Sequence, residues 1–493
     1  MRHPVDLFLA VAQRQPHAPA VSIEGQEWTY QDLEQRARQF AAHFSQISSA
    51  RVLIALPPSF DAYACILGSL LSGATHTPIN TTSPEAKLRV IAEILEPNFI
   101  VASGQLATSL SEAAPRAIIV DPARVTDTER LAGIGARNEI SYIMFTSGST
   151  GVPKGVIVPA AGLANYVDWL SQLNCTAGDR VSQQPNLGFD ISMTDIFGAL
   201  CYGATLVPLV SQADRLTPAK FIRRERITVW NSTPSAVGLM LTARHLKHEN
   251  LSTLRLINFC GEPLLKEILD AIFRELPHVL VQNTYGPTEA TVAVTCLKLT
   301  SDNYDQFIRS SVAIGDAIAG NELHLVGGGH DNEGEIVITG AQLAQGYWRN
   351  TEKTTLAFRT LQINGENRAA YFTGDWAERV DGSIYFKERI DFQVKVKGHR
   401  VELDEVAAAI RASGWPVVSV FKRGEALAAV VEKVVGQPFS EKEIRLRLSQ
   451  KLDAYAIPDR IIEVERVPRN DNEKVDRKAS LALFEELMNG EIG

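Results

Sequence analysis

The chain has few cysteines and no long hydrophobic run. Its 493 residues include five cysteines, which are widely spaced and form neither a CxxC pair nor a cluster with histidine. Neither a disulfide framework nor a zinc knuckle is therefore expected. No apolar stretch reaches the about 18 residues of a membrane-spanning helix, and the apolar stretch between Asp6 and Arg14 is too short for a signal peptide. These absences predict reduced thiols, no membrane insertion and a cytoplasmic location.

Positive charge is not in excess either. Lysine and arginine total 49 residues and aspartate and glutamate 57, so the net charge is −8. A net negative charge disfavours binding of nucleic acid or of an anionic membrane over the whole surface. With 45% hydrophobic and 22% charged residues, the composition is that of a folded globular protein. We expect two or three domains and no nucleic-acid partner.

Strand-like apolar runs alternate with helical patterns along most of the chain. The clearest strand-like runs lie at 50–58, 97–104, 226–235 and 254–264, and the clearest helical pattern lies at 63–74. This alternation predicts an α/β fold with layers of largely parallel sheets covered by helices. From about residue 310, short alternating strands separated by Gly and Asp indicate an antiparallel β subdomain.

A strand, turn and helix pattern begins just after residue 389 and opens a small α+β region. The boundary is expected near Asp391. The sequence therefore predicts a large amino-terminal domain, 1–390, and a small carboxyl-terminal domain, 391–493.

The most informative segment is YIMFTSGSTGVPKGV, residues 142–156. An apolar strand runs into six Ser, Thr and Gly residues and then Lys154. Backbone N–H groups, hydroxyls and an ammonium group in such a loop suit a polyphosphate. The segment is not a Walker A loop, because that spacing from Gly148 would require Gly in place of Pro153 and Ser or Thr in place of Gly155. A P-loop GTPase or kinase is therefore disfavoured.

The segment TSGSTGVPKG resembles the phosphate loop of the adenylate-forming superfamily, which includes acyl-CoA synthetases, luciferases and adenylation domains of nonribosomal peptide synthetases. Other segments resemble further motifs of that superfamily, in the same order and over nearly the whole chain. They are 28–37, 71–80, 189–200, 283–294, 334–348, 371–375, 388–402 and 472–478. The resemblance implies an enzyme that activates a carboxylate with ATP and Mg²⁺.

The resemblance also implies roles for particular residues in ATP binding. Thr288 would contact the α-phosphate, Glu289 the magnesium ion, and Lys154 the β- and γ-phosphates. Tyr285 would stack on the adenine, and Asp375 would accept the ribose hydroxyls. The implied catalytic residues are Lys474, Glu289, Thr288 and Lys154. The implied ATP-binding set is Thr146, Ser147, Gly148, Ser149, Thr150, Gly151, Lys154, Gly261, Glu262, Pro263, Asn283, Thr284, Tyr285, Thr288, Asp375, Arg389 and Lys474.

In the superfamily the small domain is mobile and carries a lysine that enters the active site. Lys474 matches it, and would contact the substrate carboxylate and the phosphate, so that one cation reduces the repulsion between two anions. Asp391 matches the hinge, and Gly398 the glycine of a loop that faces the site after rotation. Glu473 and Glu388 stand where the superfamily usually has glycine. The resemblance implies one arrangement for adenylation and another for thiol attack.

Asp190, in FDISMTD, indicates the class of acid. In the superfamily an aspartate here marks amino-acid substrates, and a buried carboxylate is destabilising unless a cation such as an α-ammonium pairs with it. The implied pocket is Asp190, Ile191, Thr194, Ser235, Asn258, Cys260, Thr284, Val292 and Ala293.

Within the superfamily the strings FCGE and NTYGPTEATVAV most resemble the D-alanine:carrier protein ligases, and Cys260 matches a cysteine thought to favour the D enantiomer. Thr194 and Asn258 are polar where that group has apolar residues. Buried polar groups need partners. The expected substrate is therefore D-alanine or a small polar amino acid.

The chain ends too soon after Lys474 for a fused carrier domain of about 80 residues. We therefore expect a separate phosphopantetheinylated carrier protein as the partner. Two alternatives remain open. One is an acyl- or aryl-CoA synthetase, which Asp190 disfavours. The other is a catalytically silent nucleotide-binding homologue, which the presence of Lys154, Glu289, Asp375 and Lys474 disfavours.

Overall fold

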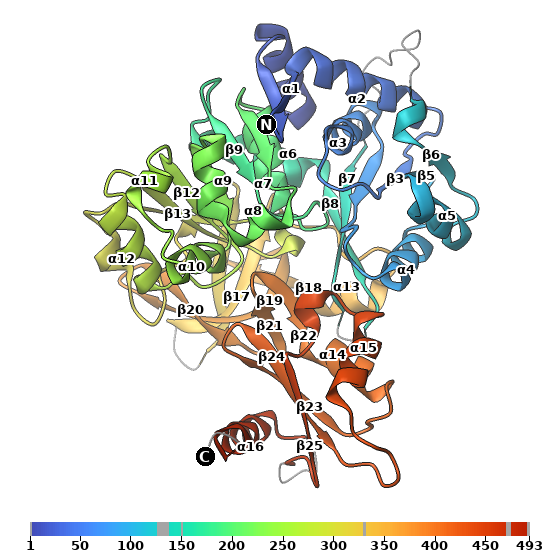
Figure 1. The fold of residues 1–493 in the computed structure, drawn as a ribbon. Coiled ribbons are helices and arrows are strands. Elements are labelled where there is room, and N and C mark those ends of the chain that lie inside the picture. Colours follow the sequence, from blue (N-terminus) through green and yellow to red (C-terminus); the bar gives the residue numbers. More distant parts are fainter. Residues whose placement is uncertain (1, 126–137, 149–150, 329–331, 470–474, 491–493) are drawn as a thin grey trace. The chain divides into compact units, whose positions relative to one another are not determined.

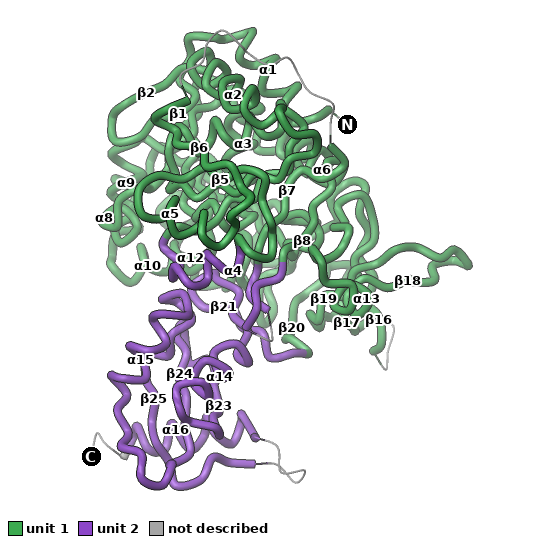
Figure 2. The backbone as a smooth tube through the Cα atoms, turned by 90° about the vertical axis from the view of Figure 1, so that its right-hand side faces the viewer, with its two compact units in different colours: residues 1–81, 92–145, 155–390 green, residues 82–91, 146–154, 391–493 purple. Residues whose placement is uncertain are grey.

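The computed structural model describes residues 2–125, 138–148, 151–328, 332–469 and 475–490. The chain forms two compact units, which Figure 2 distinguishes by colour. Unit 1 consists of residues 1–81, 92–145 and 155–390. Unit 2 consists of residues 82–91, 146–154 and 391–493.

The larger sheet has nine strands. They are β1 (Pro19–Ile23), β2 (Gln26–Thr29), β9 (Arg180–Gln183), β10 (Thr205–Pro208), β11 (Val229–Ser232), β12 (Leu256–Phe259), β13 (Leu280–Tyr285), β14 (Thr295–Leu299) and β15 (Asp316–Ala317). Their order is β15-β14-β13-β12-β11-β9-β10-β1-β2 (Figure 1). The six strands from β13 to β1 are parallel, and β14, β15 and β2 pair antiparallel at the edges. Parallel strands buried on both faces explain the continuous apolar runs of the sequence.

The second sheet has six strands. They are β3 (Arg51–Ile54), β4 (Thr75–Pro78), β5 (Phe99–Val101), β6 (Ile118–Val120), β7 (Ile140–Thr146) and β8 (Lys154–Pro159), in the order β6-β5-β3-β4-β7-β8. The pairs from β6 to β7 are parallel. The two sheets confirm the predicted layers.

Helices connect and cover these strands. Those before residue 300 are α1 (Pro4–Arg14), α2 (Tyr30–Phe44), α3 (Phe60–Ser72), α4 (Glu85–Leu95), α5 (Gly104–Ala113), α6 (Ala160–Trp169), α7 (Ser192–Leu200), α8 (Gln212–Leu216), α9 (Pro218–Glu225), α10 (Pro234–Thr242), α11 (His248–Leu251) and α12 (Lys266–Glu275). The helix predicted from 63–74 is α3, which Ser59 caps at its start and Gly73 (φ 75°) ends. Its residues 62–71 are all buried, as expected for a helix that is apolar on every side.

A five-stranded antiparallel sheet follows, as predicted. It contains β16 (Asn321–Gly327), β17 (Glu333–Gly340), β18 (Phe358–Ile363), β19 (Glu366–Val380) and β20 (Ser383–Arg389). α13 (Thr351–Ala357) precedes β18. The register of β19 and β20 places Asp375 opposite Arg389.

Unit 2 has the predicted mixture of helices and strands after residue 391. Its elements there are β21 (Gln393–Val396), β22 (His399–Glu402), α14 (Leu403–Arg411), β23 (Val418–Arg423), β24 (Ala426–Glu432), α15 (Glu441–Ser449), β25 (Arg460–Val464) and α16 (Arg477–Gly490). α14, α15 and the three-stranded sheet β23-β24-β25 share one hydrophobic core.

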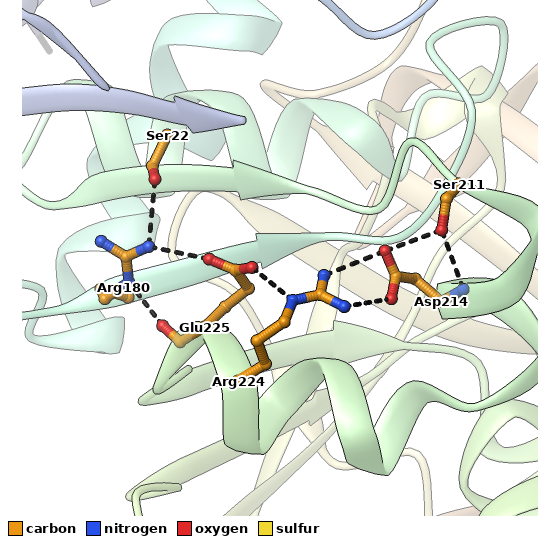
Figure 3. A network of polar contacts seen from close by, with 6 residues as sticks. All are labelled: Ser22, Arg180, Ser211, Asp214, Arg224 and Glu225. Atoms are coloured by element: carbon orange, nitrogen blue, oxygen red, sulfur yellow. Dashed lines mark hydrogen bonds and ion pairs between the residues drawn. The ribbon is translucent and has the colours of Figure 1, made fainter. Parts of the chain in front are cut away.

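Charged side chains join α9 to the larger sheet (Figure 3). Arg180 on β9 donates hydrogen bonds to the hydroxyl of Ser22 (3.1 Å) and to Oε2 of Glu225 (3.2 Å). Arg224 donates to Oε1 of Glu225 (2.8 Å) and to both carboxylate oxygens of Asp214 (2.8 and 3.0 Å). These bonds to Arg224 hold the pKa of Asp214 below its usual value. The network stabilises the end of α9 against β9.

Within the described ranges, no helix has both the length and the hydropathy that crossing a membrane requires.

Candidate active site

Most of the predicted site residues of unit 1 lie at the carboxyl ends of neighbouring parallel strands. Such ends meet at one edge of a sheet, where open α/β sheets bind ligands. Asp190 and Thr194 follow β9, Ser235 follows β11, and Cys260 follows β12. Thr284 is the second-last residue of β13 and donates a hydrogen bond to the carbonyl of Phe259 (2.7 Å). The structure therefore brings together residues that are about 100 positions apart in sequence.

Asp190 carries a buried carboxylate oxygen. Its Oδ2 has no hydrogen-bond partner among the described residues. Burial raises the pKa of Asp190 to about 6. A hydrogen bond from Thr288 opposes this increase, and the negative charge of Glu289 adds to it. At neutral pH the carboxylate is ionised, and it lies where a bound cation would stabilise it.

Thr194 has a partner that the sequence did not reveal. Its hydroxyl lies 2.7 Å from the hydroxyl of Tyr166, a fully buried residue of α6. Burial raises the pKa of Tyr166 well above its usual value, so the ring stays neutral. Because Thr194 already has a protein partner, its hydroxyl does not require a polar substrate. Asn258 differs, since its buried Oδ1 has no hydrogen-bond partner among the described residues.

Small side chains form the apolar part of the pocket. Cys260, Val292 and Ala293 are buried and belong to the same hydrophobic core as Tyr166. The sulfur of Cys260 lies 4.0 Å from the carbonyl oxygen of Val292. Ile191 is partly buried and packs against this core.

A tight turn between β13 and β14 carries Thr288 and Glu289. Both residues belong to the 3₁₀ turn η3 (Thr288–Ala290), and Glu289 is fully buried. The hydroxyl of Tyr347 donates to Oε1 of Glu289 (2.8 Å), and the backbone N–H of Ala344 donates to its carbonyl (2.8 Å). Tyr347 was not predicted as a site residue, because nothing in the sequence indicates this long-range contact.

Asp375, Tyr285 and Arg389 form one cluster. Tyr285 donates to Oδ2 of Asp375 (2.6 Å), and Arg389 donates to Oδ1 (2.7 Å). The hydroxyl of Thr373 accepts the backbone N–H of Asp375 (3.0 Å) and so orients the carboxylate. Burial, followed by the negative charge of Asp375, raises the pKa of Tyr285 well above its usual value. Each carboxylate oxygen retains a further lone pair that can accept a hydroxyl group.

The predicted ATP-binding residues near Gly261 and Asn283 are held by polar contacts. Asn283 donates its side-chain amide to the carbonyl of Ala313 (2.8 Å). Glu262, which precedes Pro263, accepts the backbone N–H of Ser235 at Oε2 (3.0 Å). Gly261 has a φ of 96°, which glycine adopts readily.

The phosphate-loop residues belong to unit 2. Thr146 ends β7, and Lys154 begins β8. The hydroxyl of Thr146 is buried and has no partner among the described residues, whereas Ser147 donates to the carbonyl of Arg400 (3.1 Å). Gly151 (φ 78°) donates its N–H to the carbonyl of Gly148 (2.8 Å). The predicted site residues Ser149, Thr150 and Lys474 lie outside the described residues.

The predicted hinge and the glycine loop also lie in unit 2. Asp391 accepts the backbone N–H of Gln393 at Oδ1 (3.1 Å). Lys397 (φ 50°) and Gly398 (φ 85°) form the two-residue turn between β21 and β22. Positive φ at both positions is typical of a type I′ hairpin.

Known proteins resemble this chain over its full length. The model of the AMP-binding enzyme family matches residues 8–348. A D-alanine–D-alanyl carrier protein ligase of Staphylococcus epidermidis is 32% identical over 99% of both chains. One from Lacticaseibacillus rhamnosus is 30% identical over 96% of this chain and 97% of its own.

Solved structures agree with this relationship. The Vibrio cholerae adenylation domain AlmE, solved in complex with glycyl-adenosine-5'-phosphate, is 27% identical with a TM-score of 0.82 and covers 98% of both chains. A nonribosomal peptide synthetase protein with adenylation and carrier domains is 25% identical with a TM-score of 0.83, over 97% of this chain and 84% of its own. Together with the family match, these full-length similarities explain why the predicted motifs occur in order. The chain belongs to the family of AMP-binding enzymes.

Proposed function

We propose that the protein activates a small amino acid with ATP, which forms aminoacyl-AMP and pyrophosphate, and then transfers the aminoacyl group to the phosphopantetheine thiol of a separate carrier protein. The buried carboxylate of Asp190 carries this proposal. The names of the curated relatives, which are D-alanine–D-alanyl carrier protein ligases, support it.

Asp190 favours an acid that also has an α-ammonium group. Its Oδ2 is buried without a hydrogen-bond partner among the described residues, and the carboxylate is ionised above a pH of about 6. An ammonium group supplies both a positive charge and hydrogen-bond donors. A fatty or aryl acid supplies neither, and would leave a buried charge unpaired, a state that costs about 3–5 kcal/mol. A CoA synthetase for such acids is therefore the weaker alternative.

The rest of the pocket favours a small side chain. Cys260, Val292 and Ala293 are buried, and the Thr194–Tyr166 hydrogen bond occupies the polar atoms of that side. D-alanine fits this environment, and it is the amino acid named in the curated relatives. Glycine is the competing candidate, because AlmE was solved with a glycyl adenylate. Asn258 is the remaining feature that would favour a small polar amino acid.

The first step joins the amino-acid carboxylate to the α-phosphorus. A carboxylate oxygen forms the new P–O bond, the bond to the bridging oxygen of the β-phosphate breaks, and pyrophosphate leaves with that electron pair. The barrier falls mainly through positioning and charge compensation. By resemblance, Thr288 contacts the α-phosphate, Lys154 compensates the leaving charge, and Lys474 compensates the attacking carboxylate. Asp375 accepts the ribose hydroxyls.

Glu289 suits a magnesium ion. Its carboxylate is buried and oriented by Tyr347, and Mg²⁺ in nucleotide sites commonly takes one or two protein carboxylates together with phosphate oxygens. Bound there, the ion would neutralise negative charge on the phosphates. The protein's own part is to hold the Glu289 side chain at the turn.

The second step transfers the aminoacyl group. The sulfur of the carrier thiol bonds to the carbonyl carbon, the bond from that carbon to the phosphate oxygen breaks, AMP leaves, and the thiol proton passes to solvent. Asp391 and Gly398 match the hinge and loop residues that serve this step in the superfamily.

Pyrophosphate exchange tests the proposal. Wild-type protein is assayed with D- and L-alanine, glycine, D- and L-serine and β-alanine, and with acetate and benzoate as acids without an ammonium group. We expect the highest kcat/KM for D-alanine and at least about 100-fold less for both simple acids. Equal exchange with acetate or benzoate, or no exchange at all, would overturn amino-acid activation. A preference for serine would instead indicate that Asn258 binds a polar side chain of the substrate.

A further inference from the structure

One turn carries residues for both substrates. Thr288 and Glu289 lie on its predicted ATP side, and Val292 and Ala293 contribute to the amino-acid pocket. Its backbone is unusual, because Thr291 (φ 54°) and Val292 (φ 70°) are consecutive β-branched residues in the left-handed region. Such residues adopt this conformation only where surrounding contacts hold them. The conformation of the turn must therefore be imposed from outside it.

Gln342, in the loop after β17, supplies these contacts. Its side chain is fully buried. The amide nitrogen Nε2 donates to the carbonyls of Ala290, Thr291 and Ala293, at 3.3, 3.1 and 2.7 Å. In return, the hydroxyl of Thr291 donates to the backbone carbonyl of Gln342 (2.7 Å). One side-chain amide group thus contacts three carbonyl groups of the turn.

Two asparagines fix the orientation of Gln342. Its Oε1 accepts hydrogen bonds from the amide groups of Asn165 on α6 (2.9 Å) and Asn321 on β16 (2.8 Å). Its backbone N–H donates to Oδ1 of Asn321 (3.2 Å). Asn165 also donates to the carbonyl of Ala319 (3.0 Å). With two donors on one side, the amide oxygen must face the asparagines and the NH₂ group must face the turn.

We infer that Gln342 is a positioning residue that sets the shape of the 288–293 turn and thereby the amino-acid selectivity of the enzyme. This inference rests on the proposed function. The side chain acts through Val292 and Ala293, which belong to the predicted pocket. It also acts through Glu289, whose backbone carbonyl accepts a hydrogen bond from Ala344 in the same 340–347 segment. Loss of its amide would let the turn relax and widen the pocket.

The activity test compares Gln342→Met with a matched control. Methionine keeps the length of the side chain and removes the amide. Gln39→Met makes the same change on α2, where Gln39 is buried and accepts a hydrogen bond from Arg36 (2.9 Å). We expect Gln342→Met to lower kcat/KM for the preferred amino acid about ten-fold or more, and to lower its preference over glycine at least three-fold. Gln39→Met should leave this preference unchanged. A general loss of folded protein lowers all rates equally and does not change the ratio.

Amide hydrogen exchange provides a test that does not depend on activity. The N–H groups of Ala293 and Val294 donate within the turn, to Thr291 and Tyr285. In Gln342→Met their exchange should be about ten-fold faster, with no change at β11 and β12. Should Gln342→Met not fold, Thr291→Val removes the hydroxyl bond to Gln342 and should produce the same changes to a smaller extent.

Unchanged exchange in the turn together with an unchanged selectivity ratio would overturn the inference. If wild-type protein shows no amino-acid-dependent pyrophosphate exchange, the proposed function is wrong, and hydrogen exchange alone then decides whether Gln342 holds the turn.

Discussion

Asp190 is expected to favour substrate binding and to disfavour folding. Its pKa is about 6 in the folded protein against 3.8 ordinarily. The folded state therefore binds a proton on Asp190 more tightly than the unfolded state, and the contribution of Asp190 to the free energy of unfolding rises as pH falls from about 6 to about 4. Asp190→Asn removes the buried charge, and should raise the free energy of unfolding at pH 7 by about 1–3 kcal/mol. Urea denaturation at pH 7 and pH 4.5 measures both effects.

The same variant, Asp190→Asn, should use the amino-acid substrate much less efficiently. We expect kcat/KM for the amino acid to fall about 100-fold or more, with the KM for ATP nearly unchanged. In wild type, KM for the amino acid should rise as pH falls below about 6, because Asp190 becomes neutral. Asp195→Asn is the control, since Asp195 is a fully buried carboxylate on α7. Equal losses in both variants would contradict a specific role for Asp190.

Substitutions at Tyr285 and at Asp375 should affect ATP binding differently. Tyr285→Phe keeps the ring for adenine stacking and removes only the 2.6 Å bond to Asp375, so KM for ATP should change by less than about three-fold. Asp375→Asn weakens the predicted acceptor of the ribose hydroxyls and the pairing with Arg389, and KM for ATP should rise about ten-fold or more. Initial rates measured at a saturating concentration of the amino acid give the KM for ATP of each variant. The reverse order would show that the tyrosine hydroxyl binds the nucleotide.

At the scale of elements, the β21–β22 turn is expected to serve only thiol transfer. Gly398→Leu adds bulk and backbone strain at a position with φ of 85°. Gly424→Leu makes the same change in the β23–β24 turn, where φ is 57° and no atom lies within 4 Å of an added Cβ. Gly398→Leu should slow transfer to the carrier about ten-fold or more while pyrophosphate exchange stays within about three-fold.

The Gly424→Leu control should affect neither step by more than about two-fold, because its turn is far in sequence from every predicted site residue. Thioester formation on the carrier is followed with labelled amino acid. An equal effect of both substitutions on transfer would mean that backbone strain, rather than a passage beside Gly398, limits the step.

Strand β4 carries a buried histidine that should make the protein acid-sensitive. Burial lowers the pKa of His76 from 6.5 to about 3, and its ring lies against Tyr142, with centroids 5.6 Å apart. Below pH 6.5 only the unfolded chain takes up this proton, so the free energy of unfolding falls by up to about 1.4 kcal/mol per pH unit. His76→Asn should reduce the loss between pH 7 and pH 5 by about 2 kcal/mol. Denaturation curves measure it, and His17→Asn, at an exposed position, should leave the loss unchanged.

At the scale of the whole molecule, substitution of Lys474 should slow adenylation and leave thiol transfer nearly unchanged. By resemblance this lysine serves adenylation and leaves the site before thiol transfer. Lys474→Ala should therefore lower pyrophosphate exchange about 100-fold or more, whereas transfer from supplied aminoacyl-AMP to the carrier stays within about three-fold. Lys478→Ala removes an exposed lysine four residues further on and should alter neither step. Equal loss of both half reactions would contradict the two-arrangement scheme.

The sequence alone determined the layers of the fold and the chemical types at the candidate site. Strand-like runs such as 226–235 and 254–264 predicted β11 and β12, because burial on both faces leaves a continuous apolar run in the sequence. Asp190, Tyr285 and Asp375 were identifiable because each lies within a contiguous motif. The roles of the candidate site residues stay predictions, and Ser149, Thr150 and Lys474 lie outside the described residues.

Only the tertiary structure decided which polar groups are paired. Tyr166 satisfies Thr194 from 28 positions away, Gln342 satisfies the carbonyl of Ala293 from 49 positions away, and Asp375 receives the hydroxyl of Tyr285 from 90 positions away. Most buried polar groups have a hydrogen-bond partner, and any donor or acceptor that folding brings near can provide it. Local sequence therefore indicates that a partner is needed, and the packing of distant segments determines which residue it is.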